Sequence, residues 1–134
     1  MAMRDDHNLF QVERLLNGAL VTATSSSSAQ DLALYDSAEI LFETNLYVAG
    51  TSFTFSLTEC DTSGGTFTAV AAADVLGTMA PITGTGDDNL TQKVGYIGSK
   101  RYIKGLITVV SGSTGCNITV DFIGRKKKVN ALGS

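Results

Sequence analysis

Short stretches in which apolar and polar residues alternate are the feature that most limits the folds open to this chain. Residues 53–59 and 116–123 alternate in this way, and residues 102–110 form a longer apolar run rich in β-branched side chains. A period of two places every second side chain on the same face of a β-strand. Clusters of Gly, Ser, Thr and Asp, as at residues 61–65 and 111–115, mark turns between the strands.

The chain has 134 residues, which is enough for one hydrophobic core. About seven or eight short strands with regular turns favour an all-β, jelly-roll-like two-sheet sandwich. We expect an extended N-terminal arm over residues 1–18, the sandwich over 19–124 and a short basic tail over 125–134. Residues 9–16 are expected to be irregular or briefly helical, and a strand that docks on a neighbour is the alternative.

The alternation also predicts which side chains form the core. Every second apolar residue of a half-buried strand faces the same side. The predicted core consists of Leu41, Phe53, Phe55, Leu57, Ile103, Ile107, Val109, Ile118, Val120 and Phe122.

Charge is distributed unevenly along the chain. Residues 15–90 contain nine acids and no Lys or Arg, whereas residues 91–134 contain eight basic residues and one acid. This asymmetry indicates a charged partner surface or self-association between unlike faces. The alternative is that the two halves interleave in one sandwich and their charges mix.

Few residues are suited to catalysis or metal binding. The one histidine, His7, lies in the expected arm, whereas a general base needs a fixed geometry. Residues 83–89 form a glycine- and acid-rich loop without the ligand spacing of an EF-hand, so we expect a solvated turn and no metal or cofactor. Cys60 and Cys116 form no CxxC motif and are expected to be small thiols that are at least half-buried, with a disulfide as the open alternative. We therefore expect no enzymatic activity.

Two further absences concern location and partners. No apolar run approaches the length of a membrane span, and residues 1–8 are polar and acidic, unlike a signal peptide, so synthesis in the cytoplasm is expected. The cations Arg125, Lys126, Lys127 and Lys128 could contact phosphates, but no aromatic residues are interleaved with them to stack on bases. A protein partner is therefore favoured over nucleic acid.

Two stretches together resemble the small capsid cement, or decoration, proteins of tailed bacteriophages. The first has Phe53-x-Phe55-x-Leu57 followed by Cys60-Asp61 and a Gly64-Gly65 turn, and the second runs from Val94-Gly95-Tyr96 through Lys100-Arg101-Tyr102-Ile103-Lys104 into a strand. The similarity covers about residues 39–123. It implies a jelly-roll-like virion protein, made in the host cytoplasm, that binds the outside of a capsid shell as a homodimer or homotrimer.

The resemblance implies the major capsid protein and other copies of this chain as partners, and it implies no catalytic residues. Both chain ends lie outside the matched region. The residues expected to dock on the capsid are Leu9, Phe10, Val12, Arg125, Lys126, Lys127 and Lys128. Two alternatives remain open: a carbohydrate-binding or host-attachment module, which would need exposed aromatic side chains, and a tail or neck structural protein of a virion.

Overall fold

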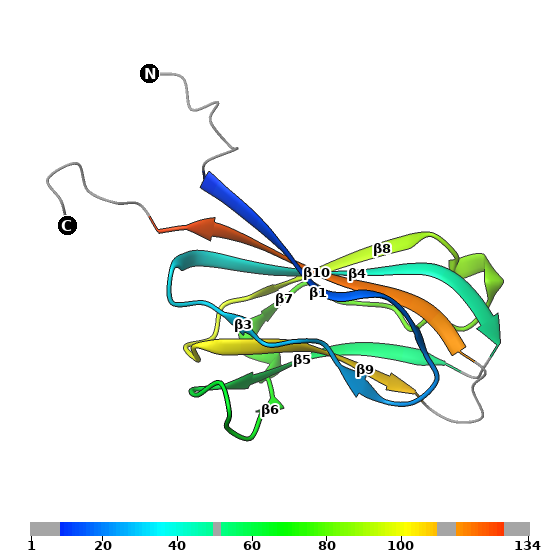
Figure 1. Ribbon diagram of the computed structural model, residues 1–134, viewed down its shortest axis with the longest axis horizontal. Coiled ribbons are helices and arrows are strands. Elements are labelled where there is room, and N and C mark those ends of the chain that lie inside the picture. Colours follow the sequence, from blue (N-terminus) through cyan, green and yellow to red (C-terminus); the bar gives the residue numbers. More distant parts are fainter. Residues whose placement is uncertain (1–8, 50–51, 110–114, 128–134) are drawn as a thin grey trace, which may run out of the picture.

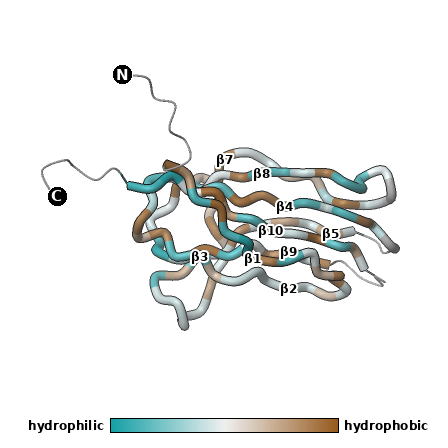
Figure 2. The backbone as a smooth tube through the Cα atoms, turned by 45° about the horizontal axis from the view of Figure 1, so that its top comes forward, coloured by the Kyte–Doolittle hydropathy of each residue, from teal (hydrophilic) through white to brown (hydrophobic). Residues whose placement is uncertain are grey.

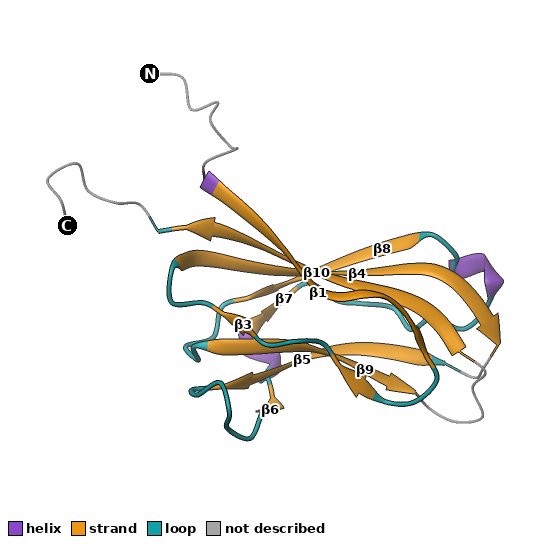
Figure 3. Cartoon of the chain, viewed as in Figure 1, coloured by secondary structure: helices purple, strands orange, loops and turns teal. Residues whose placement is uncertain are grey.

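The computed structural model describes residues 9–49, 52–109 and 115–127, and these form two antiparallel sheets packed face to face (Figure 1). In spatial order, sheet A contains β1 (Phe10–Val21), β10 (Gly115–Lys126), β4 (Tyr35–Ala49), β8 (Leu90–Tyr96) and β7 (Val75–Leu76). Sheet B contains β2 (Ser25–Ser26), β9 (Tyr102–Val109), β5 (Phe53–Cys60) and β6 (Thr68–Ala69), and β3 (Gln30–Asp31) also pairs with β9. The connections include two short 3-10 helices, η1 (Ala72–Asp74) and η2 (Thr85–Asp87) (Figure 3).

The strand order is that of a jelly roll. The pairs are nested: β1 with β10, β2 and β3 with β9, β4 with β8, and β5 with β6. Successive pairs alternate between sheet A and sheet B, and the pairings of β10 with β4 and of β9 with β5 complete each sheet. The predicted all-β, jelly-roll-like sandwich is therefore confirmed.

The core lies between the two sheets and follows the alternation of the sequence. Hydrophobic and hydrophilic residues alternate along the strands (Figure 2), and in β5 the exposed Thr54 and Ser56 separate the buried Phe53, Phe55 and Leu57. The predicted core residues found buried are Phe53, Phe55, Leu57, Ile103, Ile107, Ile118, Val120 and Phe122. The phase of these strands was therefore correctly predicted.

The two remaining predicted core residues differ. Val109 is half-buried and packs against the core from the end of β9. The prediction that Leu41 belongs to the core was wrong, because Ile40 and Phe42 of β4 are fully buried and Leu41 points to the outer face of sheet A. Three consecutive apolar residues leave the phase of a strand undetermined, and only packing against sheet B selects one.

A glycine of sheet B lies directly against an aromatic side chain of sheet A. Gly105 lies in the middle of β9, and a Cβ atom built there would be 3.0 Å from the Phe42 ring and 3.1 Å from Val120 Cγ1. The Phe42 ring stacks on Phe55 at a centroid distance of 4.6 Å. Gly105 therefore makes room for an aromatic pair that joins sheet A to sheet B.

The boundaries predicted for the two ends were wrong within the described residues. Residues 10–18 belong to β1 and are hydrogen-bonded to β10, so the expected arm and the brief helix are replaced by an edge strand. Residues Arg125 and Lys126 complete β10, so the basic tail starts later than residue 125. Pairing between segments far apart in sequence overrides weak local propensity here.

A bulge explains why β1 does not look like a strand in the sequence. The register with β10 shifts between Arg14 and Leu16 and again between Leu16 and Ala19. Gly18, with a φ of 50°, adopts the left-handed conformation that the bulge requires. The extra residues break the period of two that marks a strand. The Asn17-Gly18 pair within the bulge has residue types that also end helices, which is why the sequence indicated a helix stop.

Candidate functional site

The pairing of β1 with β10 brings the two ends of the described chain together on the outer face of sheet A. Phe10 is opposite Arg125, and Val12 is opposite Ile123. Directly opposite residues share a face of the sheet, and this face is the outer one because the adjacent Phe122 is fully buried inside. Phe10 and Val12 are 41% and 60% exposed. We define the terminal patch as Phe10, Val12, Ile123 and Arg125 on this face, together with the exposed Lys126 and Lys127 that follow Arg125 in the sequence.

Most of the predicted docking residues therefore lie together. Arg125, Lys126 and Lys127 are exposed, and the backbone N–H of Lys127 donates to the Leu34 carbonyl at 2.9 Å. Leu9 is half-buried just before β1, and Lys128 lies outside the described residues. The apolar and the basic docking segments lie near opposite ends of the sequence, and the structure places them side by side in sheet A.

The patch adjoins an open groove of about 560 Å³ at this end of the molecule. Across sheet A, Ile123 is opposite Glu39, Glu39 is opposite Gly95, and Gly95 is opposite Leu76. Leu76 and Ile97 are 55% and 57% exposed at the far side of the groove. Its outer wall thus combines apolar side chains of β1, β10 and β7, and of Ile97 just after β8, with the Glu39 carboxylate of β4.

Sequence analysis missed the groove residues, although one signal was present. Ile123 follows the inward-facing Phe122 and so falls on the polar phase of an alternating strand. An apolar residue in that phase indicates an apolar spot on the solvent face. The contributions of Glu39, Leu76 and Ile97 depend on strand order, which the sequence does not reveal.

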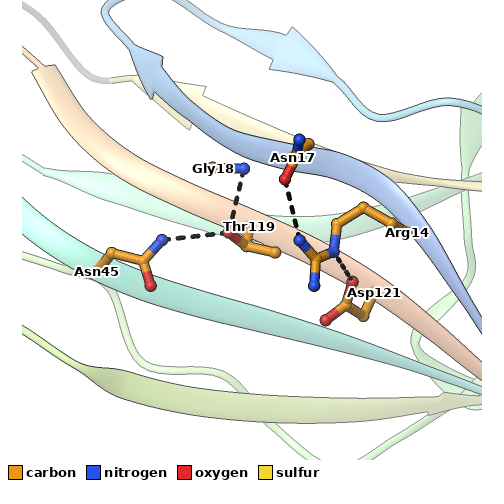
Figure 4. Close-up of polar contacts among 6 residues, drawn as sticks. All are labelled: Arg14, Asn17, Gly18, Asn45, Thr119 and Asp121. Carbon is orange, nitrogen blue, oxygen red and sulfur yellow. Dashed lines mark hydrogen bonds and ion pairs between the residues drawn. The ribbon is translucent and has the colours of Figure 1, made fainter.

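Polar contacts on the same outer face fasten the bulged part of β1 (Figure 4). Arg14 Nε donates to Asp121 Oδ1 at 2.7 Å, and Arg14 Nη1 donates to Asn17 Oδ1 at 2.9 Å. Thr119 Oγ1 accepts from the Gly18 backbone N–H and from Asn45 Nδ2, both at 3.1 Å. These contacts link β1, β10 and β4 and thereby hold the terminal patch to the sandwich.

Ion pairs show how far the two halves of the chain neutralise each other. Lys100 Nζ contacts Asp61 Oδ2 at 2.8 Å, and Arg101 forms two 2.9 Å hydrogen bonds with Asp31. Arg101 also lies 5.3 Å from the Tyr102 ring centroid. The charges mix at these two places, whereas Arg125, Lys126 and Lys127 form no ion pair within residues 9–49, 52–109 and 115–127.

The carboxylates of the glycine- and acid-rich loop accept hydrogen bonds from backbone N–H groups of the loop itself and of β4. Asp87 Oδ2 accepts from the Thr83 N–H at 2.9 Å, and Asp88 Oδ1 accepts from the Tyr47 N–H at 2.7 Å. In the part of the chain that the structure describes, no three Cys, His, Asp or Glu residues are grouped to hold a metal ion. His7 lies outside that part.

The tyrosines provide no exposed aromatic platform. Tyr96 is buried, and its hydroxyl donates to Glu59 Oε2 at 2.6 Å across the two sheets and accepts from the Lys100 N–H. Burial and the Glu59 hydrogen bond raise the pKa of Tyr96 well above its usual value. The other tyrosines are half-buried, with Tyr35 edge-on to Phe122 at 5.0 Å, so Phe10 is the exposed aromatic residue of the described chain.

The two cysteines are free thiols in different sheets. Cys60 is half-buried at the end of β5 opposite Tyr102, and Cys116 is fully buried at the start of β10. Burial raises the pKa of the Cys116 thiol to about 11. The expectation of two small thiols is confirmed, and the alternative of a disulfide is not realised.

The difference in burial between Cys60 and Cys116 predicts selective labelling of Cys60. At pH 8, the native protein should react quickly with an aromatic disulfide reagent at Cys60 and at least about 100-fold more slowly at Cys116, because the thiolate is the nucleophile and Cys116 is shielded. Thiol titration with and without urea measures this. The Cys60→Ser variant should lose the fast phase only, and two equal fast phases would contradict the burial of Cys116.

The sequence matches no protein-family model, and no curated protein matches it. Among the described residues, no helix is long and apolar enough to span a bilayer.

Proposed function

We propose that this protein is a virion structural protein, a capsid cement or decoration protein that binds the outside of a phage capsid shell through the terminal patch. The observation that carries this proposal is the register of β1 with β10, which places Phe10 beside Arg125 and Val12 beside Ile123. The patch combines an apolar centre with cations that have no acidic partner within the described chain. Its binding partner, the major capsid protein, should therefore offer an apolar site with an acidic rim.

The fold supports a binding role in two further ways. The long strands of the two stretches that resemble cement proteins, β5 and β9, pair with each other in sheet B, where Phe53 is opposite Val109 and Cys60 is opposite Tyr102, while Val94 to Tyr96 of the second stretch belong to β8 of sheet A. This pairing leaves β1 and β10, which carry the terminal patch, outside the two matched strands. The half-buried and buried tyrosines do not favour the carbohydrate-binding alternative, which needs exposed aromatic rings.

The proposal predicts that two different changes in one patch weaken capsid binding. Val12→Asp removes apolar contact, and replacing Arg125, Lys126 and Lys127 with Glu reverses the charge. Each should raise the apparent dissociation constant at least about tenfold in co-sedimentation with capsids of the virus that encodes the protein, which corresponds to about 1.4 kcal/mol. Raising salt should weaken the wild type more than the charge-reversed variant.

A matched control distinguishes binding through the terminal patch from binding through the rest of the outer face of sheet A. Leu46 is 54% exposed and lies opposite Asn117 toward the other end of β4, so Leu46→Asp makes the same chemical change away from the patch and should bind normally. Full occupancy by both patch variants would show that another surface docks. Binding of the wild type to tails or necks but not to capsids would replace the proposal with a tail or neck role.

A further inference from the structure

β1 is an edge strand of sheet A whose exposed edge is confined to a few residues. On one side β1 pairs with β10, and no other strand within the described residues pairs with it. The Ser28 N–H donates to the Leu15 carbonyl at 3.0 Å, which occupies the edge at that residue. The bulge that follows, up to Ala19, interrupts the regular ladder. Residues 10–14 are the regular part that stays open, and we name them the open edge.

We infer that the open edge pairs antiparallel with the open edge of a second copy, with Val12 opposite Val12 on a two-fold axis. This interface rests on the proposed function and deepens it, because it specifies the self-association that the resemblance to cement proteins implies. In this register, Phe10 lies opposite Arg14 of the other copy on the outer face, and Gln11 lies opposite Glu13 on the other face. Each of these pairs is complementary: a β-branched pair, a cation over an aromatic ring, and an amide beside a carboxylate.

The side chains are placed to make these contacts. Val12 is 60% and Phe10 is 41% exposed, and the Arg14 side chain is 55% exposed although its Nε holds Asp121. A guanidinium donates hydrogen bonds in its plane and stacks on a ring through its face, so Arg14 can do both. Two other registers also keep both outer faces on the same side, but their contacts are less favourable. One places Glu13 opposite Glu13, and the other pairs only residues 10–12.

The two-fold axis of such a pair is perpendicular to the sheet, so both outer faces stay on the same side. The dimer would therefore present two terminal patches to one capsid surface, and binding at two points strengthens attachment. Pairing of five residues buries less than the roughly 1,200 Å² typical of stable interfaces. The free protein should accordingly dimerise in a concentration-dependent way.

Disulfide trapping tests both the interface and its register. Directly opposite residues in antiparallel strands are about 4.5–5.5 Å apart at Cα, within reach of a disulfide. In a Cys60→Ser background, Val12→Cys should form a covalent dimer under mild oxidation at high protein concentration. Gln11→Cys, one residue off the axis, and Leu20→Cys, beyond the bulge and 54% exposed, should give at least about fivefold less.

Sedimentation equilibrium of the free protein provides a second readout. Val12→Lys places two like charges on the axis and should raise the dimer dissociation constant at least about tenfold, whereas Val12→Thr keeps a β-branched side chain and should dimerise. Preferential trapping of Gln11→Cys or Leu20→Cys, or a strict monomer at every concentration, would overturn the inference. These measurements contain no capsid, so a result that overturns the dimer does not contradict the proposed capsid binding. Loss of capsid binding in a variant that still dimerises does not contradict the dimer.

Discussion

Replacing Phe55 with alanine is expected to lower the free energy of unfolding by about 3–5 kcal/mol. Phe55 is 9% exposed, and its ring stacks on Phe42 at 4.6 Å with an angle of 18° between the planes. Phe55 belongs to sheet B and Phe42 to sheet A, so the cavity left by alanine would open between the two layers. Urea denaturation followed by circular dichroism measures the loss.

Two variants control for this result. Phe55→Leu keeps most of the buried volume and should cost clearly less than Phe55→Ala. Thr54→Ala changes the exposed neighbour on the opposite face of β5 and should stay within about 0.5 kcal/mol of the wild type. A stability of Phe55→Ala near that of the wild type would mean that the inward phase of β5 is wrong. Because domains of this size are stable by only about 5–15 kcal/mol, the expected loss is a large fraction of the total.

Replacing Arg14 with alanine is expected to cost about 1–3 kcal/mol, more than removing the charge of its partner Asp121. The Asp121 side chain is 11% exposed and the Arg14 side chain 55% exposed. Without Arg14, a nearly buried carboxylate loses its ionic hydrogen bond, and Asn17 loses its contact in the bulge. Without the charge of Asp121, as in Asp121→Asn, Arg14 remains hydrated and the loss should be below about 1 kcal/mol.

An exposed ion pair gives the matched control. Arg101 and Asp31 are 54% and 41% exposed and are joined by two hydrogen bonds, yet Arg101→Ala should cost below about 1 kcal/mol because water screens the pair. The three variants can be compared by chemical denaturation in one buffer. Equal losses for Arg14→Ala and Arg101→Ala would show that burial of Asp121 contributes nothing to the anchoring of β1.

The anchoring matters because the proposed docking and self-association surfaces both depend on β1. Arg14 fixes the strand to Asp121 of β10 before the bulge, and Thr119 of β10 holds Gly18 within it. Because of the bulge, the second half of β1 does not offer a regular edge. Natural sheets use such bulges to avoid uncontrolled edge pairing. The open edge and the terminal patch therefore occupy the first half of β1 only.

The sequence alone determined the strands in which alternation is uninterrupted. β5, β9 and β10 were predicted with the correct inward face, because a period of two and Gly-, Ser- and Asp-rich turns are local signals. The same alternation predicted a two-sheet sandwich. The chemistry of the terminal patch was also readable, since the apolar residues near one end and the cations near the other were both singled out.

The tertiary structure alone decided the phase of β4, the strand character of β1 and the composition of the patch. Leu41 has apolar neighbours on both sides, so only packing against sheet B turned Ile40 and Phe42 inward. β1 contains a bulge, and its hydrogen bonds go to β10 at the far end of the sequence. Phe10 meets Arg125 because the jelly roll winds its first and last strands side by side, and such non-local pairing leaves no trace in local sequence pattern.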